Sequence, residues 1–349
     1  MLYQTKNPHG GDRYARPVRL DFSTNTNPLG APESVRQAVV QSAQLVDRYP
    51  DPFCRELTAA LARYEKVPQE YILCGGGAAE LIFSFCAAAR PKRALELAPT
   101  FSEYAAAVTA AGGTVERYPL RWEEDFALTG GFPAALERSG CDAVFLCSPN
   151  NPTGRLIDPE LLERTAQVCR RRGIRLFLDE CFLDLSVGES MKALLAGHPE
   201  ILILKAFTKN FAMAGLRLGY CLTSDRELLA AMSRTAQPWN VSVPAQMAGA
   251  AALEETEYLC RARELIAGQR EWLREKLTAL GFYVCPSQAN YLLLHHERPA
   301  AEKLLERGIL TRDCSNYHGL GEGWLRVAVR PPEENRQLIC ALESILEEA

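Results

Sequence analysis

Hydrophobic positions along the chain fall into two alternating patterns. Short continuous apolar runs, as in YILC, AVFLC, IRLFL and ILIL, alternate with longer segments of helical period, as in PELLERTAQVCRRRG. Continuous apolar runs are typical of strands buried on both faces, and the helical segments between them are typical of crossover connections. The pattern therefore predicts an α/β protein with a mostly parallel sheet flanked by helices.

The pattern changes after about residue 243. Long amphipathic segments come first, and shorter strand-like runs follow, among them FYVCPS, ANYLLLH, GILTRDC and WLRVAVR. This order predicts a second, smaller α+β lobe, in keeping with a length of 349 residues, at which single cores stop growing. We expect an N-terminal arm (residues 1–30) that joins the small lobe, a large domain (31–243) and a small C-terminal domain (244–349).

Composition and charge narrow the classes of function. The net charge of −4, from 39 basic and 43 acidic residues, leaves no basic field that would hold a nucleic acid. Neither a signal-peptide core nor an apolar run of membrane-spanning length is present. The twelve cysteines include no C-x-x-C pair and the five histidines show no ligand spacing, which favours reduced thiols and no metal site. These features predict a cytoplasmic protein that binds neither nucleic acid nor membrane.

Two stretches that follow predicted strands carry groups suited to a polar ligand. CGGGAAE (residues 74–80) opens a helix, and the free amides and dipole of a helix start attract an anion such as phosphate. A tight turn also needs glycine for its backbone conformation, so these glycines indicate either a phosphate site or only a turn. FLCSPNNPTG (145–154) ends an apolar strand in a turn with Asn150, Asn151 and Thr153. Ligands of open α/β sheets gather at this edge.

Asp179 and Lys209 complete the series. IRLFLDECF (174–182) ends an apolar strand in a carboxylate, which needs strong donors or a cationic partner; a helix N-cap or an ion pair with a nearby arginine is the alternative. Lys209 follows the run ILILKAFT, and Arg217 lies eight residues later. Unless Lys209 is a surface charge, desolvation and the arginine would lower its pKa and make the amine a nucleophile and base. A phosphate cradle, a buried carboxylate, an asparagine turn and a lysine are what pyridoxal phosphate requires.

On these residues the chain resembles a fold-type I pyridoxal-phosphate enzyme of the class I/II aminotransferase group over nearly its whole length. The strings NNPTG, LDECF and FTK followed by GLRLG carry the resemblance. It implies the fold-type I transferase fold, with pyridoxal phosphate bound by the large domain. It also implies a homodimer with a shared active site.

The resemblance further implies a role for each matching residue. Lys209 forms the imine with the cofactor aldehyde, Asp179 pairs with the pyridine nitrogen, and Asn151 donates to the phenolate oxygen. Phe101 matches the aromatic residue that stacks on the ring, and Tyr49 matches a tyrosine that reaches the cofactor phosphate of the neighbouring subunit. The remaining residues would hold the cofactor phosphate: Gly76, Gly77, Ala78, Thr208 and Arg217.

Three positions depart from the family pattern. Ala206 stands where relatives often have serine, and Ala79 stands where many have a hydroxyl residue, which would remove two hydrogen bonds to the cofactor phosphate. Phe182 stands where a tyrosine usually contacts the phenolate oxygen. A phenyl ring cannot donate a hydrogen bond, so that contact would rest on Asn151.

Two branches of the group share this core: histidinol-phosphate aminotransferases and the threonine-phosphate decarboxylases of cobalamin biosynthesis. The chain resembles the decarboxylases in His-Gly-Gly at residues 9–11, in DFSTNTNPLG and in RDCSNYHGLGEGWLRVAVR. A small phosphorylated amino acid is then the substrate, with its phosphate bound by His9, Asn25 and Arg312 and its α-carboxylate by Arg326. His-Gly-Gly also serves as an ordinary turn, and strand-end arginines also serve as surface charges.

The reaction that this resemblance implies is decarboxylation of L-threonine O-3-phosphate to (R)-1-aminopropan-2-yl phosphate and CO2. The bond to Cα that lies perpendicular to the cofactor ring is the one that breaks, so the same groups could catalyse transamination. Histidinol-phosphate transamination and decarboxylation of serine phosphate therefore stay open. A cofactor-binding protein without activity is a further alternative, favoured by Ala79 and Ala206 and opposed by the retained Lys209 and Asp179.

Overall fold

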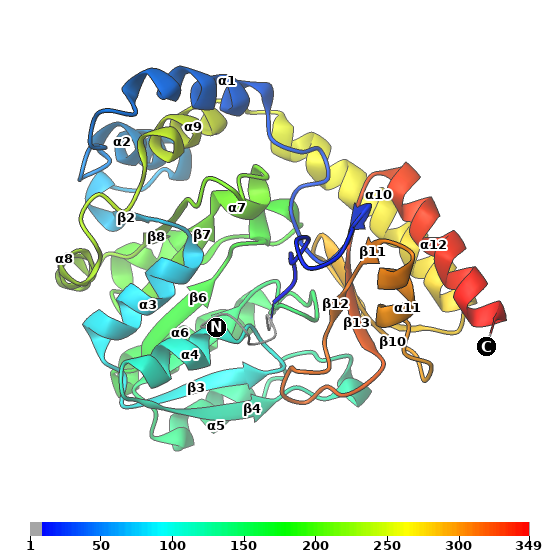
Figure 1. Ribbon diagram of the computed structural model, residues 1–349. Coiled ribbons are helices and arrows are strands. Elements are labelled where there is room, and N and C mark those ends of the chain that lie inside the picture. The colour runs from blue at the N-terminus through cyan, green and yellow to red at the C-terminus, as the bar shows by residue number, and fades with distance from the viewer. Residues whose placement is uncertain (1–8, 349) are drawn as a thin grey trace.

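The computed structural model describes residues 9–348, so residues 1–8 of the predicted arm and residue 349 lie outside it. A seven-stranded sheet forms its centre, with helices on both faces (Figure 1). The spatial order is β2 (Ile72–Gly75), β8 (Gly219–Leu222), β7 (Ile201–Ala206), β6 (Arg175–Asp179), β5 (Ala143–Cys147), β3 (Arg93–Ala98) and β4 (Thr114–Pro119). Only β8 runs in the direction opposite to the other six strands. The prediction of a mostly parallel sheet flanked by helices is confirmed.

Alternation along the strands explains why both faces are covered. Phe145 and Phe177 belong to one core cluster, and their neighbours Val144 and Leu176 belong to another, as the two-residue period of a strand requires. The first cluster includes α3 (Ala78–Ala89), α4 (Glu103–Ala110) and α8 (Arg226–Thr235). The second includes α1 (Glu33–Ser42), α2 (Arg55–Glu65), α5 (Phe132–Ser139), α6 (Pro159–Arg172) and α9 (Val243–Leu253). Burial on both faces is why these strands are apolar throughout.

Local signals set the ends of α6, which connects β5 to β6. Asp158 caps its start by accepting a hydrogen bond from the Leu161 amide at 3.0 Å, and Pro159 occupies the first turn, where its missing N–H costs nothing. Gly173 ends the helix in the left-handed conformation. The helix thus ends close to the start of β6, which pairs in parallel with β5.

A smaller antiparallel sheet lies beside the large one (Figure 1). Its order is β12 (Arg312–Asp313), β13 (Trp324–Ala328), β10 (Tyr291–His295) and β9 (Tyr283–Val284). A separate core joins this sheet to α10 (Tyr258–Ala279), α11 (Ala301–Glu306) and α12 (Pro332–Glu347). Near the N-terminus, β1 (Leu20–Asp21) pairs in parallel with β11 (Ile309–Leu310), and Phe22 packs in the same core. The domain boundaries at residues 30 and 243 stay a prediction.

Ten of the twelve cysteines are buried, and all twelve are unpaired. Within residues 9–348, no helix combines the length and apolar character needed to cross a bilayer. The same residues contain no cluster of three or more histidine, cysteine or carboxylate side chains arranged to hold a metal ion.

Candidate active site

Three neighbouring strands bring polar residues to one edge of the large sheet. β5, β6 and β7 are parallel and adjacent, so their carboxyl ends lie side by side. Asp179 is the last residue of β6, Asn151 follows β5, and Lys209 lies in α7 (Phe207–Asn210), directly after β7. All three line one cavity of about 340 Å³. The carboxyl edge of the sheet is therefore a concave site with an amine, a carboxylate and an amide.

Most of the residues singled out from the sequence line this cavity, which we call the Lys209 cavity. They come from the N-terminal segment, both sheets and the start of α3: His9, Asn25, Ala78, Phe101, Asn151, Asp179, Thr208, Lys209, Arg217, Arg312 and Arg326. Tyr49, Gly76 and Gly77 are not among its lining residues. The cavity thus combines segments from both ends and the middle of the chain.

The amine of Lys209 lies in a desolvated and electropositive environment. Burial, followed by the positive charges of Arg326 and Arg217, lowers the pKa of Lys209 to about 8. Its Nζ lies 5.5 Å from the centroid of the Phe182 ring. A larger fraction of this amine is neutral at pH 7 than for an ordinary lysine, so it can act as a nucleophile and as a base.

Asp179 is a buried carboxylate with two donors. Its Oδ2 accepts a hydrogen bond from the Tyr104 hydroxyl at 2.6 Å, and its Oδ1 accepts one from the Cys181 amide at 2.9 Å. Burial raises the pKa of Asp179, although these donors and the charge of Lys209 oppose the shift. A cation bound opposite Asp179 would reverse the effect of burial and keep the carboxylate ionised.

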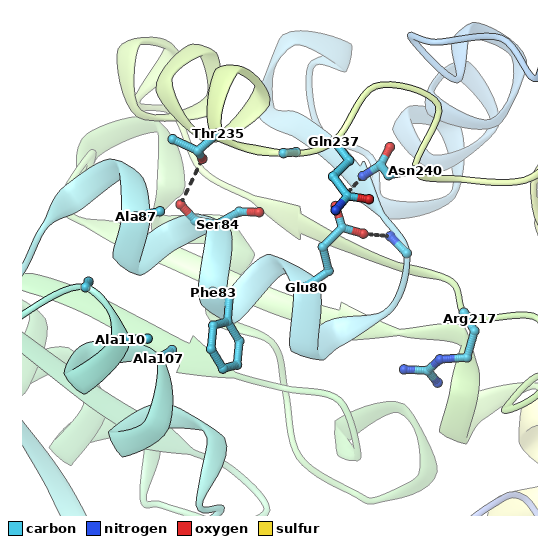
Figure 2. A pocket seen from close by; sticks show the side chains of 13 residues that line it. Glu80, Phe83, Ser84, Ala87, Ala107, Ala110, Arg217, Thr235, Gln237 and Asn240 are labelled. Atoms are coloured by element: carbon cyan, nitrogen blue, oxygen red, sulfur yellow. Dashed lines mark hydrogen bonds between the residues drawn. The ribbon is translucent and has the colours of Figure 1, made fainter. Parts of the chain in front are cut away.

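Gly76 faces a different cavity. Its amide donates to the carboxylate of Glu80, which also accepts a hydrogen bond from Asn240 (Figure 2). This second cavity of about 470 Å³ shares Arg217 with the Lys209 cavity. The Gly76 amide, which the sequence analysis assigned to the cofactor phosphate, is therefore occupied within the chain.

The amides available to an anion belong to Ala78 and Ala79. They open α3, where helix amides have no intrahelical acceptor, and both residues line the Lys209 cavity. The Gly77 amide instead donates to the Gly75 carbonyl at 2.8 Å. At Gly77, where φ is +105°, a Cβ would lie 2.8 Å from a guanidinium nitrogen of Arg217. Glycine there allows the arginine to approach the helix start, and an arginine beside free helix amides is suited to a phosphate.

Arg326 connects the small sheet to the N-terminal segment and to the turn after β5. Its guanidinium donates to Asn151 Oδ1 and, at 2.8 Å, to the Ser23 carbonyl. Because Asn151 Oδ1 accepts this bond, the Nδ2 amide of Asn151 is the atom of that side chain that can donate a hydrogen bond to a ligand. Two buried polar atoms of the lining, Arg326 Nε and Asn25 Oδ1, have no hydrogen-bond partner within residues 9–348. Buried polar groups without partners are rare in proteins, so the cavity is suited to a polar ligand.

Arg312 and Arg326 lie directly opposite each other. The register of β12 and β13 pairs them, although 14 positions separate them in the sequence. Arg312 also donates to Asn316 Oδ1 at 2.8 Å, and its guanidinium lies 5.0 Å from the centroid of the Tyr317 ring. Directly opposed residues project to the same face of a sheet, which places two guanidinium groups on one side of the cavity.

His9, in the N-terminal segment, lies against Phe101 and Glu103. His9 Nε2 lies 2.9 Å from Glu103 Oε1, and the rings of His9 and Phe101 have centroids 5.9 Å apart. Phe101 in turn meets the edge of Tyr104, with centroids 5.7 Å apart. The segment around His9 is thereby joined to the start of α4.

Tyr49 lies on the surface and outside the cavity. Its side chain is 79% exposed, and its ring packs on Trp239, with centroids 4.6 Å apart. A single chain therefore does not bring Tyr49 to Lys209.

Several lining residues were missed by the sequence analysis: Ser23, Glu103, Tyr104, Cys181 and Tyr317. Tyr104 carried a usable signal, because it follows Phe101 by only three positions in the chain. Its contact with Asp179 joins residues 75 positions apart, which local pattern does not reveal.

The described residues fit the three groups of pyridoxal phosphate. An aldehyde needs an amine with a lowered pKa, which Lys209 supplies. A protonated ring nitrogen needs a buried anion, which Asp179 supplies. The phosphate needs donors, and Ala78, Ala79 and Arg217, which line the cavity, would supply them. Ala79 and Ala206 line the cavity without hydroxyl groups, so backbone amides carry more of this binding.

Comparison with known proteins gives the same family. The sequence profile of the family "Aminotransferase class I and II" matches residues 18–342. A threonine-phosphate decarboxylase from Salmonella typhimurium is 38% identical over 94% of this chain and 91% of its own length. A histidinol-phosphate aminotransferase from Methanosarcina mazei is 32% identical over 93% of this chain and 87% of its own length. The structure of a histidinol-phosphate aminotransferase from Clostridium acetobutylicum superimposes with a TM-score of 0.88 at 27% identity, covering 95% of this chain and all of that one.

Proposed function

This chain belongs to the class I and II aminotransferase family, its cofactor is pyridoxal phosphate, and from that premise we propose that it decarboxylates L-threonine O-phosphate. The observation that carries the proposal is the opposed pair Arg312 and Arg326 on one side of the Lys209 cavity. Two guanidinium forks suit a substrate with two anionic groups, a phosphate and a carboxylate. The product would be (R)-1-aminopropan-2-yl phosphate, for use in cobalamin biosynthesis.

Pyridoxal phosphate supplies the electron sink for the electron pair released at the substrate Cα. Asp179, oriented by Tyr104 and the Cys181 amide, keeps a proton on the ring nitrogen. Lys209 moves a proton at Cα, a task that suits an amine with a pKa of about 8.

Arg326 would hold the substrate carboxylate, and His9, Asn25 and Arg312 its phosphate. The two anchors would orient the substrate against the cofactor, and that orientation would decide which bond at Cα breaks. Loss of the carboxylate would release CO2, whereas loss of the hydrogen would lead to transamination at the same site.

Product analysis tests this choice. Purified, cofactor-loaded protein is mixed with L-threonine O-phosphate without any 2-oxo acid, and the products are measured by mass spectrometry. We expect many turnovers to aminopropanol phosphate. This result would distinguish decarboxylation from transamination, which stops after one event per site when no acceptor is present. The Lys209→Ala protein serves as the inactive control. Unchanged threonine phosphate, or consumption of one equivalent per site, would exclude decarboxylation.

Histidinol-phosphate transamination is the second candidate. It is supported by the 32% identity to a histidinol-phosphate aminotransferase and by the shared fold. Turnover of histidinol phosphate with 2-oxoglutarate would identify it. Serine phosphate should be assayed beside threonine phosphate, because one methyl group contributes only about 1–3 kcal/mol of discrimination.

We also propose that the active unit is a homodimer in which Tyr49 completes the site of the partner. Tyr49 and Trp239 form an exposed aromatic pair, and Phe53 and Val46 are exposed as well. Arg217 lines the second cavity as well as the Lys209 cavity (Figure 2), so a side chain that entered the second cavity from another subunit would lie near the proposed phosphate site. Analytical ultracentrifugation would test the dimer directly.

A further inference from the structure

A buried charge cluster lies next to Lys209 but outside its cavity. Lys205, near the end of β7, is only 2% exposed, and its Nζ lies 2.8 Å from Asp184 Oδ1 and 3.4 Å from Glu65 Oε1. Glu65 also contacts Lys192 at 2.6 Å. None of these four side chains lines the Lys209 cavity. Buried ion pairs contribute little net stability, because desolvation offsets their attraction, so the cluster calls for another explanation.

Asp184 joins the two ends of the segment that carries Lys209. Its Oδ1 accepts from Lys205 Nζ at 2.8 Å, and its Oδ2 accepts from Asn210 Nδ2 at 2.7 Å. Asn210 is 3% exposed and the Asp184 side chain is 18% exposed, so this bond is largely shielded from water. One carboxylate therefore closes residues 205–210 into a loop, with Lys209 inside it.

Asn27 holds the same segment from another side. Its backbone amide donates to the Lys209 carbonyl at 3.0 Å, and its Nδ2 donates to the Asn210 carbonyl at 2.8 Å. The last carbonyls of a helix lack intrahelical donors, and Asn27 satisfies two of them at the end of α7. The backbone of Lys209 is thus fixed while its amine reaches into the cavity.

Asp184 also belongs to the segment that carries Asp179. It lies in a 3-10 turn (Leu183–Leu185) that follows β6, which ends at Asp179. Asp179 would pair with the ring nitrogen of the cofactor, and Lys209 would react with its aldehyde. Because these groups are at fixed positions of one rigid ring, the distance between Asp179 and Lys209 has to match them. We infer that Asp184 is a positioning residue that sets the spacing between Asp179 and Lys209, with Lys205 and Asn210 as its two anchors.

The two anchors can be removed separately. Asn210→Ala removes one hydrogen bond and leaves the ion pairs intact, whereas Lys205→Met removes the other anchor together with its charge. Lys205→Arg keeps a cation that can bond to Asp184 and should rescue the loss. Lys192→Met is the matched control, because it removes a lysine from Glu65 without touching residues 205–210.

Cofactor binding provides the measurements. Protein stripped of its cofactor is titrated with pyridoxal phosphate, and the visible band of the loaded protein is followed against pH to give the midpoint of its change. That midpoint depends on how closely the Lys209 amine lies to the groups that face it, namely Arg326, Arg217, Asp179 and Cys181. If the two anchors fix the position of Lys209, their loss changes these distances and therefore the midpoint. We expect Asn210→Ala and Lys205→Met to shift the midpoint and to weaken binding roughly 10- to 100-fold, by analogy with the loss of residues that orient metal ligands. Lys205→Arg and Lys192→Met should behave as wild type.

A purely structural cluster predicts a different result. The variants would then lose thermal stability but keep the wild-type dissociation constant and pH midpoint, and the inference would be overturned. If Lys205→Met does not fold, Asn210→Ala decides the matter alone, because it disturbs no ion pair. These measurements of cofactor binding need no substrate. Their outcome therefore tests the role of Asp184 whether or not the proposed decarboxylation is correct.

Discussion

Replacing Tyr104 with phenylalanine should weaken the binding of pyridoxal phosphate. The Tyr104 hydroxyl donates to Asp179 Oδ2 at 2.6 Å, and the side chain is fully buried, so water does not replace the lost donor. The Cys181 amide would remain the donor to Asp179 Oδ1. The substitution therefore removes one hydrogen bond from the carboxylate that we propose to pair with the ring nitrogen.

The size of the effect follows from the charge on the acceptor. A hydrogen bond to a charged group contributes about 1.5–3 kcal/mol, and each ~1.4 kcal/mol is a factor of ten in a dissociation constant. Burial already raises the pKa of Asp179, and removal of a donor that opposes this shift would raise the pKa further. We expect the dissociation constant of pyridoxal phosphate to rise roughly 10- to 100-fold.

Fluorescence titration of the cofactor-free protein measures this constant. Tyr291→Phe is the matched control, because Tyr291 is equally buried and its hydroxyl donates at 2.9 Å to a neutral acceptor, the Asn150 carbonyl. It should change stability more than cofactor affinity. Wild-type affinity in Tyr104→Phe, or an equal loss in both variants, would refute the reasoning.

Four further outcomes are expected. The rate at which pyridoxal phosphate joins the cofactor-free protein should rise with pH around a midpoint near 8, because the Lys209 amine is neutral above its lowered pKa; a stopped-flow midpoint near that of free lysine would contradict this. Burial raises the pKa of Glu180 from 4.5 to about 7. Between pH 4.5 and about 7 the unfolded chain releases a proton that the folded protein keeps, so the free energy of unfolding should fall by about 3 kcal/mol as the pH rises through this range. Urea titrations of Glu180→Gln should show a free energy of unfolding that depends less on pH. Arg312→Ala should raise KM for the phosphorylated substrate far more than for unphosphorylated threonine. Mixing inactive Tyr49→Phe and Lys209→Ala subunits should restore activity in mixed dimers if Tyr49 acts across the interface, because one of the two sites is then intact.

The central part of the site follows from local sequence. Asp179 ends an apolar strand and Lys209 directly follows another, so the parallel order of β6 and β7 is enough to bring them to one edge. Asn151 follows β5 in the same way. The residues in these positions are adjacent in space because each lies at the same end of its own strand.

Other contacts depend on register and long-range packing. Tyr104 reaches Asp179 from a helix, and Asp184 bonds to both Lys205 and Asn210, pairs that no periodicity signals. The opposition of Arg312 and Arg326 requires the register of β12 and β13, which the intervening loop sets. The Gly76 amide was expected to face an anion, but Glu80, one helical turn onward, reaches back to occupy it.

The pairing of β1 with β11 has a consequence for the order of events on the ribosome. The N-terminal segment with Asn25 and Asn27 leaves the ribosome early, whereas the strand that carries Arg326 is made near the end of synthesis. At about 5–20 residues per second, the early segment waits on the order of tens of seconds for β11 and β13. Asn27 can meet the Lys209 segment before then, but Ser23 has to await Arg326. A nascent chain therefore passes through a stage at which the lysine segment is complete and the two arginines proposed as substrate anchors, Arg312 and Arg326, do not yet exist, so chains truncated before Arg312 should lose substrate recognition.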